Sequence, residues 1–520
     1  MYSVRDLIEA RAAERPDRVY LVFEDREFTF AEMDLRSRQV AQGLADRGLK
    51  KGDRVAVLLE NCPDFLHLWW GILRLGAVMV PVNLRLTASE AAYIVDHSGS
   101  RALVVGPAAA HLLEPLRGRC RAVEHWLSLG GGPADALESF YSLAGDPERP
   151  PIEADDDAVI LYTSGTTGFP KGVVHTHGNY RITAESFVRT AELKSSDRLL
   201  TANPLFHVNA QFYSCIGTLT AGSVFILAPR FSASRMWDWT RRHRANKVVM
   251  LLALTTILYQ RPAAADDADN PVEIVVAGGA PAGCYHAFEE RFGVRLQTIY
   301  SLTEAPLSLM SPPGMRCVDG AVGCAMVTPD GVENRVLIVD EENREAPPGT
   351  AGEIVLRNPA LMKAYLRDPE ATAAAMAGGW LHTGDRGLRD EKGWIHFLGR
   401  AKDVIRKKGE NIGAAEVEGV LAGHSAVAEA AVVGVRPADA AGEEEVMAFV
   451  VAAEGRRLSW PDLIAHCEAN LADFKVPRFW RALEALPKTA TNRVVKARLG
   501  AEGPPEAAAG TFDRASKREG

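Results

Sequence analysis

The segment Tyr162-Thr-Ser-Gly-Thr-Thr-Gly-Phe-Pro-Lys-Gly172 follows directly on an apolar run at residues 158–161. Its glycines permit close approach of the backbone, and its hydroxyl and main-chain N–H groups can donate hydrogen bonds to phosphate oxygens. Lys171 adds a point charge. The segment therefore predicts a phosphate-holding loop at the end of a buried strand.

Two other interpretations of this loop fit its residues less well. A Walker A loop ends in Gly-Lys-Ser/Thr, whereas Lys171 stands between Pro170 and Gly172, which excludes that class of nucleotide triphosphatase. A plain Ser/Thr/Gly linker would not account for a single lysine placed behind a proline.

Short apolar runs rich in Val and Leu alternate with longer helical patterns on both sides of the loop. This alternation is typical of β-α-β units, so we expect an α/β fold with mainly parallel sheets. No fixed-period repeat is present, which argues against a solenoid. The expected strands are residues 55–59, 77–82, 223–227, 247–252 and 273–277, and the expected helices are 63–75, 233–244 and 285–292.

Composition and charge exclude some classes of function. The chain has 520 residues, of which 47% are hydrophobic and 24% are charged, as in an ordinary globular protein with room for several domains. Lysine and arginine number 59 against 67 acidic residues, so the net charge is −8. No global positive field is available to bind nucleic acid, and a polyanionic ligand must be bound by local groups.

The cysteines and the apolar runs favour a cytoplasmic protein. The seven cysteines form no Cys-x-x-Cys pair and are odd in number, so we expect reduced and mostly buried thiols. Residues 1–18 lack the apolar stretch of a signal peptide. The most apolar run, residues 248–259, is shorter than the ~20 residues that cross a bilayer and predicts a buried strand followed by a helix.

The character of the sequence changes after about residue 400. Two apolar strands at residues 428–435 and 446–451 lie between helical patterns, which predicts a small α+β domain behind a hinge. Residues 501–520 have the composition of a disordered tail.

The phosphate-loop segment resembles that of the adenylate-forming superfamily, which contains acyl-CoA synthetases, adenylation domains of peptide synthetases and luciferases. Eight further segments match that family in order, over nearly the whole chain. They are Pro204-Leu-Phe-His207, Gly278-Gly-Ala-Pro281, Tyr300-Ser-Leu-Thr-Glu304, Gly352-Glu353, Gly379-Trp-Leu-His-Thr-Gly-Asp385, Gly399-Arg-Ala-Lys-Asp403, Lys408-Gly-Glu-Asn-Ile412 and Phe474-Lys-Val-Pro477. Residues 61–65, 206–211 and 292–298 are most similar to medium-chain and carnitine-type CoA ligases.

The resemblance implies a large adenylate-forming domain and a small mobile one. The implied boundaries are an AMP-binding N-terminal domain at 1–402 and a mobile C-terminal domain at 403–500. The small domain would rotate about a hinge at Asp403 between two half-reactions. Relatives are commonly homodimers, and the sequence leaves both a monomer and a homodimer open.

The resemblance also implies the reaction and its cofactors. A small-molecule carboxylate attacks the α-phosphate of ATP, and a thiol then displaces AMP from the acyl-adenylate. Glu304 would ligate Mg²⁺, Tyr300 would stack near adenine and Thr303 would bind the α-phosphate. Asp385 would accept both ribose hydroxyls, with Arg400 beside it. The other nucleotide-binding residues implied are Thr163, Ser164, Gly165, Thr166, Thr167, Gly168, Gly278, Gly279, Ala280 and Ser301, with Lys171 as a catalytic cation.

The acyl and thiol sites follow from the same resemblance. His207 would gate the acyl pocket and help to place the acid, although a lone histidine can equally be a core residue. The expected pocket residues are Val208, Asn209, Gln211, Ala277 and Leu302. No carrier-protein serine site follows the small domain, so the expected thiol is free coenzyme A, bound by Arg406, Lys407, Lys408, Gly409, Glu410 and Lys475. A solvated basic turn is the alternative for these cations.

Two histidines after the loop, His175 and His177, could suggest a metal site. No third ligand is evident in the sequence, so we do not expect one there.

The sequence departs from the family pattern at two positions. Relatives end in Pro-Lys-Thr-Ala-Thr-Gly-Lys, whose final lysine bridges the carboxylate and the α-phosphate, whereas this chain has Asn492 and Arg493 at the last two places. A guanidinium is a wide planar fork and does not replace a compact ammonium in a narrow gap. Ser301 stands where the family has glycine, so it either reshapes the acyl pocket or fits locally.

These departures predict an enzyme that converts an acyl-adenylate and CoA to acyl-CoA, with impaired ATP-dependent adenylation. The adenylate would then come from a separate adenylating enzyme. The alternatives are a complete two-step carboxylic acid:CoA ligase and a stand-alone adenylation enzyme that loads a carrier protein. A non-catalytic adenylate-binding protein is disfavoured because Lys171, Glu304 and Asp385 are all present.

Overall fold

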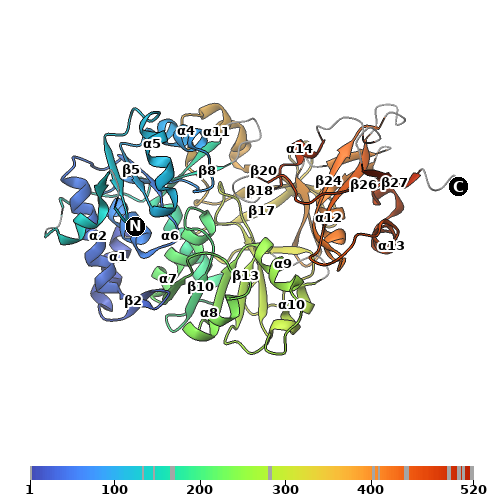
Figure 1. Ribbon diagram of the computed structural model, residues 1–520, viewed down its shortest axis with the longest axis horizontal. Coiled ribbons are helices and arrows are strands. Elements are labelled where there is room, and N and C mark those ends of the chain that lie inside the picture. The colour runs from blue at the N-terminus through green and yellow to red at the C-terminus, as the bar shows by residue number, and fades with distance from the viewer. Residues whose placement is uncertain are drawn as a thin grey trace.

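The computed structural model describes residues 3–131, 134–144, 147–163, 170–278, 284–400, 404–407, 410–437, 444–488, 494–500, 505 and 510–515. A large region built on two sheets occupies one side of the molecule, and the C-terminal elements form a smaller part at the other side (Figure 1). All seven cysteines have free thiols, as expected. No helix in the described ranges is long and apolar enough to cross a membrane.

Within the described residues, one sheet of the large region has eight strands. They are, in spatial order, β19 (Ala364–Tyr365), β9 (Lys171–Thr176), β8 (Asp157–Thr163), β4 (Val78–Pro81), β3 (Arg54–Leu58), β5 (Ala102–Val105), β6 (His125–Ser128) and β7 (Asp135–Ala136). The strands from β8 to β7 pair in parallel, whereas β9 is antiparallel to both β8 and β19.

The second sheet has thirteen described strands and is mixed. They are, in spatial order, β17 (Arg335–Val339), β18 (Gly352–Arg357), β20 (Leu381–Arg389), β21 (Ile395–Arg400), β16 (Ala321–Ala325), β15 (Leu309–Met310), β14 (Arg295–Tyr300), β13 (Ile274–Ala277), β12 (Lys247–Met250), β10 (Arg198–Thr201), β11 (Val224–Leu227), β1 (Val19–Phe23) and β2 (Arg26–Thr29). The pairs from β14 to β1 are parallel. The described pairs between β14 and the β17 edge of the sheet are all antiparallel. The expectation of mainly parallel sheets did not include this antiparallel half.

Helices cover these sheets and connect their strands. They are α1 (Val4–Glu14), α2 (Phe30–Ala45), α3 (Pro63–Arg74), α4 (Ala88–Ser98), α5 (Leu113–Arg117), α6 (His177–Thr190), α7 (Ile216–Ala221), α8 (Met236–His243), α9 (Leu252–Gln260), α10 (Tyr285–Phe292) and α11 (Pro369–Ala375). Short 3₁₀ segments occur at η1 (Pro107–Leu112), η2 (Leu137–Ser142) and η4 (Ala377–Gly379).

Local sequence explains where several helices begin. Capping boxes start α1, α2 and α4, in which the hydroxyls of Ser3, Thr29 and Thr87 each accept a hydrogen bond from the backbone three residues on. Helix α3 is apolar on most of its surface, and Trp69 and Trp70 at its centre are fully buried. A helix of this kind belongs in the interior, and α3 packs there against α2.

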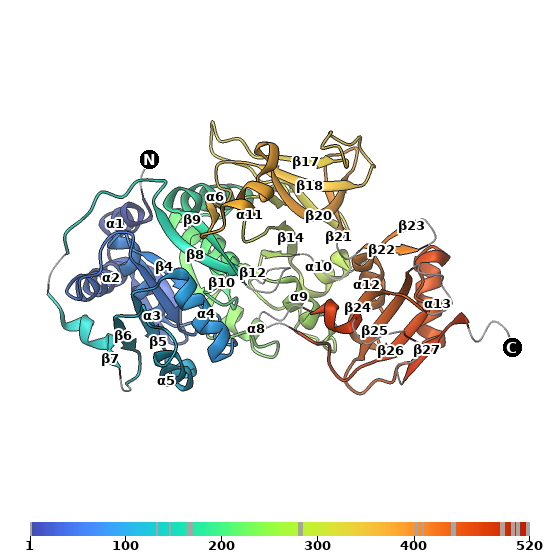
Figure 2. The same cartoon turned by 90° about the horizontal axis from the view of Figure 1, so that it is seen from above.

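Within the described residues, the C-terminal part contains a four-stranded sheet and three helices that pack on it. Its elements are β22 (Val404–Lys407), β23 (Glu410–Gly413), α12 (Ala414–Ala422), β24 (Val427–Val435), β25 (Glu445–Ala452), α13 (Trp460–Asn470), η6 (Asp473–Lys475), β26 (Phe479–Ala482), α14 (Lys496–Gly500) and β27 (Thr511–Asp513). Strands β22 and β23 form a separate hairpin at the edge nearer the large region (Figure 2). Strand β27 pairs with β26, so the expected disordered tail is wrong for residues 510–515.

The apolar run at residues 248–259 forms β12 and α9, as predicted, but α9 is buried on one face only. Leu251 and Leu252 are 38% and 44% exposed, and Ile257 is 41% exposed. The prediction of a buried helix failed because this face of α9 is turned away from the core of its own region.

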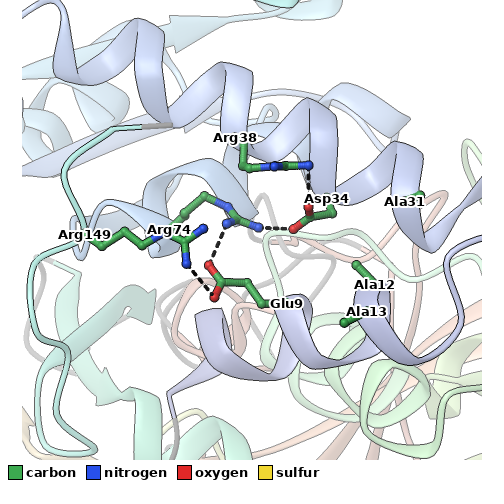
Figure 3. A pocket seen from close by; sticks show the side chains of 8 residues that line it. All are labelled: Glu9, Ala12, Ala13, Ala31, Asp34, Arg38, Arg74 and Arg149. Carbon is green, nitrogen blue, oxygen red and sulfur yellow. Dashed lines mark hydrogen bonds and ion pairs between the residues drawn. The ribbon is translucent and has the colours of Figure 1, made fainter. Parts of the chain in front are cut away.

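A buried ion network joins the first three helices (Figure 3). Arg74 of α3 is 2% exposed, and its guanidinium contacts Glu9 of α1 at 2.7 Å and also Asp34 of α2. Arg149 reaches Glu9 at 3.3 Å, and Arg38 reaches Asp34 at 3.0 Å. These residues line a hollow of about 370 Å³. Their charged side chains already form ion pairs with one another.

Replacing Arg74 with Met should lower the free energy of unfolding by about 3 kcal/mol, because Asp34 and Glu9 would lose a buried partner. Arg242 and Asp25 form an ion pair with side chains 60% and 71% exposed, so Arg242→Gln should cost less than about 0.5 kcal/mol. Urea unfolding of both variants measures the difference. Equal losses would show that the buried network does not join the helices energetically.

Candidate functional site

The predicted nucleotide residues lie where parallel strands end. Ala277 ends β13, Tyr300 ends β14 and Thr163 ends β8. Lys171 begins β9 directly opposite Thr163 in the antiparallel β8–β9 pair. The carboxyl ends of parallel strands are the usual ligand-binding edge of α/β sheets.

Asp385 is held by two groups. It stands opposite Arg400 in the β20–β21 pair, and the Nε atom of Arg400 lies 3.3 Å from Oδ1. The hydroxyl of Tyr300 donates to Oδ2 at 2.8 Å. Burial and the neighbouring Asp385 raise the pKa of Tyr300 well above its usual value, so its hydroxyl remains a donor. The three residues that the sequence assigned to adenosine are therefore in contact.

Tyr365 connects the predicted metal ligand to the loop lysine. Its hydroxyl donates to Oε1 of Glu304 at 2.9 Å, and the Nζ atom of Lys171 lies 4.8 Å from the centre of its ring. Lys171 also lies 3.8 Å from Oδ2 of Asp368. Glu304 offers a hard carboxylate beside the predicted phosphate loop, which fits Mg²⁺, an ion that takes one or two carboxylates together with substrate phosphates and water.

His175 fixes the backbone beside Glu304. Its Nε2–H donates to the carbonyl of Thr303 at 2.6 Å, and its Nδ1 accepts from the amide of Asn179 at 2.9 Å. Burial lowers the pKa of His175 to about 4, so the ring is neutral and keeps this pattern. The Nδ1 of His177 accepts from the backbone N–H of Val4 at 3.3 Å. Among the described residues, these two histidines belong to no cluster of three or more potential metal ligands.

Buried amides hold the loop that carries His207. The amide of Asn61, from the turn before α3, accepts from the N–H of Leu205 at 2.8 Å and donates to the carbonyl of Asn203 at 3.1 Å. The Nδ2 of Asn203 in turn donates to Oδ1 of Asn209 at 2.6 Å. The side chain of Asn209, which was expected in the acyl pocket, is therefore tied to the base of this loop.

The chain continues from this loop into η3 (Asn209–Cys215), a π-helical segment. Such segments are rare and frequently lie at functional sites. Burial and the nearby charge of Arg85 lower the pKa of His207 to about 4, so its ring is neutral at physiological pH. Val208 and Leu302 are half-buried, as residues of a pocket wall can be, whereas Ala277 is fully buried.

Gln211 and Ser301 make contacts within the protein. Gln211 is fully buried, donates to the carbonyl of Leu205 at 2.7 Å and accepts from the hydroxyl of Tyr180 at 2.5 Å. The amide of Gln211 is therefore bonded within the protein, and its assignment to the acyl pocket remains a prediction. The side chain of Ser301 lies near the buried hydroxyl of Tyr213, which is compatible with a local fit.

The described lysines assigned to coenzyme A are ion-paired. Lys407 is 13% exposed and lies 2.8 Å from the carboxylate of Glu445. Lys475 lies 2.6 Å from Glu416. Both lysines therefore have carboxylate partners inside the C-terminal part, as Lys171 has in Asp368, and their assignment to coenzyme A remains a prediction. Sequence reasoning could not foresee the pairs, because both acids are distant along the chain.

Several predicted residues lie outside the described ones. They are Ser164, Gly165, Thr166, Thr167, Gly168, Gly279, Ala280, Asp403, Lys408, Gly409 and Arg493, together with the side chains of Arg406 and Glu410.

The C-terminal part contacts the large region through α9 and also through β21, which lies beside α12 and β23. The amide of Gln260 donates to the carbonyls of Val427 and Ala428 at 3.2 and 3.4 Å. Lys488 and Val494, on either side of residues 489–493, form a β-bridge. Helix α14 follows this bridge and lies on the side that faces the large region in both Figure 1 and Figure 2.

Comparison with known proteins decides the family. The model described as AMP-binding enzyme matches residues 8–366, and that described as AMP-binding enzyme C-terminal domain matches residues 416–493. The chain belongs to the AMP-binding enzyme family. It is 34% identical to a crotonobetaine/carnitine–CoA ligase of Salmonella arizonae, over 93% of this chain and 96% of the relative.

Solved structures agree in fold with this family member. An anthranilate CoA ligase in complex with anthranoyl-AMP has a TM-score of 0.88 at 26% identity and covers 97% of this chain and 98% of its own. O-succinylbenzoate coenzyme A synthetase from Bacillus subtilis, with ATP and magnesium ion, has a TM-score of 0.82 at 28% identity and covers 95% and 98%. The protein is thus an adenylate-forming enzyme of the acyl-CoA ligase type, with a large N-terminal and a small C-terminal domain.

Three polar residues near the site escaped prediction from the sequence: Tyr365, His175 and Asn61. Tyr365 and Asn61 contact residues 61 and 144 positions away, and His175 contacts one 128 positions away. The one available signal was that Asn61 and His175 are polar residues beside apolar runs.

Replacing Tyr365 with Phe should slow ATP-dependent adenylate formation about tenfold, since one hydrogen bond to a carboxylate is worth about 1.5–3 kcal/mol. The Mg²⁺ concentration for half-maximal rate should rise. The reaction of a supplied acyl-adenylate with CoA should change less than about twofold. Steady-state kinetics of the two routes measure this, and equal losses in both would contradict the assigned contact.

Stability should fall on acidification because of His175 and His207. Burial holds each folded pKa near 4, against 6.5 for the free side chain, so the unfolded chain binds protons first as the pH drops. The free energy of unfolding should therefore decrease between about pH 6.5 and pH 4. Urea unfolding across this range measures the slope, and His207→Gln should reduce it. An unchanged slope in that variant would contradict the buried, neutral state of His207.

Proposed function

We propose that the protein forms an acyl-CoA thioester from an acyl-adenylate and free CoA, and that its own ATP-dependent adenylation is impaired. The observation that carries this proposal is that Tyr365 contacts both Lys171 and Glu304. The relatives that match over nearly the whole chain are named CoA ligases. The impaired half-reaction rests on Arg493, where the family pattern has lysine.

The contacts support specific roles at the nucleotide. Asp385 would accept the ribose hydroxyls, with Arg400 orienting the carboxylate from 3.3 Å. Lys171 would move from Asp368 to the phosphates, since an anionic ligand competes for its charge. Glu304 would hold Mg²⁺, which supplies charge neutralisation at the phosphates when it is bound. Thr303 would bind the α-phosphate, with its backbone fixed by His175.

Arg493 would impair adenylation because a planar fork cannot fill the place of an ammonium between two oxygens. Loss of one well-placed electrostatic stabiliser typically costs ~10²–10³ in rate. The neighbouring lysines have other partners: Lys488 lies 2.6 Å from Glu429 and Lys496 lies 2.7 Å from Glu418. Both side chains are more than half-buried, and their pairing does not favour a substitute role.

We infer that the domains alternate about Asp403, with a large domain at 1–402 and a mobile domain at 403–500. Gln260 contributes two side-chain hydrogen bonds to the contact between the two parts, and such bonds can break and re-form when domains move. Adenylation would use the face that carries α14, and thioester formation would use the face near Gly409.

The acyl group would be uncharged and apolar. Val208, Leu302 and the exposed Leu252 offer apolar surface, and a Cβ on Gly278 would lie 3.3 Å from Leu252. The positive charge of Arg85 near His207 would repel a cationic acid. We therefore favour an aromatic, branched or aliphatic acid over the trimethylammonium acids for which the Salmonella relatives are named.

Wild type should make acyl-CoA at least about 100-fold faster from a supplied acyl-adenylate than from acid, ATP and Mg²⁺, by the size of a lost electrostatic stabiliser. Arg493→Lys should raise the ATP-dependent rate at least about tenfold and leave the adenylate route unchanged. Chromatographic measurement of acyl-CoA with a panel of acids tests both.

Equal and fast rates from both routes in wild type would favour the runner-up, a complete two-step CoA ligase. No gain in Arg493→Lys would place the block elsewhere. Lys488→Arg is a matched control on the same segment and should change neither route, since that lysine is paired with Glu429.

A further inference from the structure

Helix α4 lies beside both ends of the phosphate-loop segment. Tyr93 and His97 stand four residues apart on one face of this helix, and their rings stack with centres 5.3 Å apart. The hydroxyl of Tyr93 donates to the carbonyl of Pro170 at 3.3 Å. The hydroxyl of Tyr162 donates to Nδ1 of His97 at 2.7 Å. One helix face thus contacts the chain before residue 163 and after residue 169.

The strand register explains why Tyr162 can reach His97. Tyr162 of β8 is directly opposite Gly172 of β9. A Cβ at residue 172 would lie only 3.1 Å from the ring carbon Cζ of Tyr162 and 3.0 Å from Ile160. Because residue 172 is glycine, the Tyr162 ring has room to lie across it and reach α4.

The end of α4 also touches the turn that pairs with the loop lysine. Gly99 caps the helix in the left-handed conformation, and a Cβ there would lie 3.1 Å from the guanidinium of Arg367. The next residue, Asp368, lies 3.8 Å from the Nζ atom of Lys171. The helix, the loop ends and the lysine form one continuous set of contacts.

We propose that α4 is a positioning element for the phosphate loop, in which Tyr93 and His97 fix the two ends of the loop and so set its approach to the β- and γ-phosphates of ATP. The inference rests on the proposed role of residues 163–171 as a phosphate loop. Neither side chain touches the nucleotide in this assignment. Both act through Tyr162 and Pro170.

The test uses variants that remove single contacts. His97→Leu removes the acceptor, Tyr162→Phe removes the donor, and His97→Asn keeps an oxygen acceptor close to the position of Nδ1. Each single loss should weaken MgATP binding about tenfold, which corresponds to one hydrogen bond. Binding of AMP, which lacks the β- and γ-phosphates, should change less than about twofold. His97→Asn should restore most of the affinity.

A double-mutant cycle separates the contact from general loss of stability. His97→Leu combined with Tyr162→Phe should weaken MgATP binding no further than either change alone, because both remove the same bond. Tyr141→Phe is a matched control, since its hydroxyl also donates to a part-buried partner, which is Asp64 of α3 and not a residue of α4 or of the loop ends. It should lower the melting temperature without changing MgATP affinity.

Calorimetric titration of full-length wild type and variants with MgATP and with AMP gives these constants. Additive losses in the cycle, equal losses for AMP, or unchanged MgATP affinity in the variants would overturn the positioning role of α4. Failure of wild type to bind MgATP at all would overturn the proposed function and this inference together.

Discussion

The hydrogen bond from Tyr365 to Glu304 joins the two sheets of the large region at the candidate site. Tyr365 lies on β19 of the eight-stranded sheet, and Glu304 follows β14 of the thirteen-stranded sheet. Lys171 of β9 lies over the same tyrosine ring. The predicted phosphate cation and the predicted metal carboxylate are therefore placed by one side chain, and their separation depends on how the two sheets pack.

A chain with a net charge of −8 can bind polyphosphate only through groups that are held locally. The described cations at the site already have carboxylate neighbours, Lys171 with Asp368 and Arg400 with Asp385. Such pairs hold the cations in place before a ligand arrives, and a ligand phosphate can then compete for Lys171. His175 and α4 contact the chain segments beside Glu304 and Lys171. Residues outside the recognised motifs therefore also help to position the site.

Much of the fold and part of the site could be predicted from the sequence. The alternation of apolar runs and helical patterns placed β3, α3, β13 and α10 nearly to the residue. Glu304 and Asp385 were found because each lies within a short recognisable motif. Tyr365 and His97 were missed because their partners lie 61 and 65 residues away, a pairing that only the packing of separate elements creates. The ion pair of Lys407 was missed for the same reason, since its partner Glu445 belongs to another strand.

The central claim is that this chain retains thioester formation and has largely lost adenylation. ATP–pyrophosphate exchange by wild type, with a panel of apolar acids and no CoA, isolates the first half-reaction. Formation of acyl-adenylate from acyl-CoA and AMP, measured with the same enzyme, reports the second half-reaction in reverse. The ATP–pyrophosphate exchange rate should be at least about 100-fold lower than the rate of this reverse reaction, because one misplaced cation costs about that much in rate. Exchange as fast as the reverse reaction would contradict the central claim.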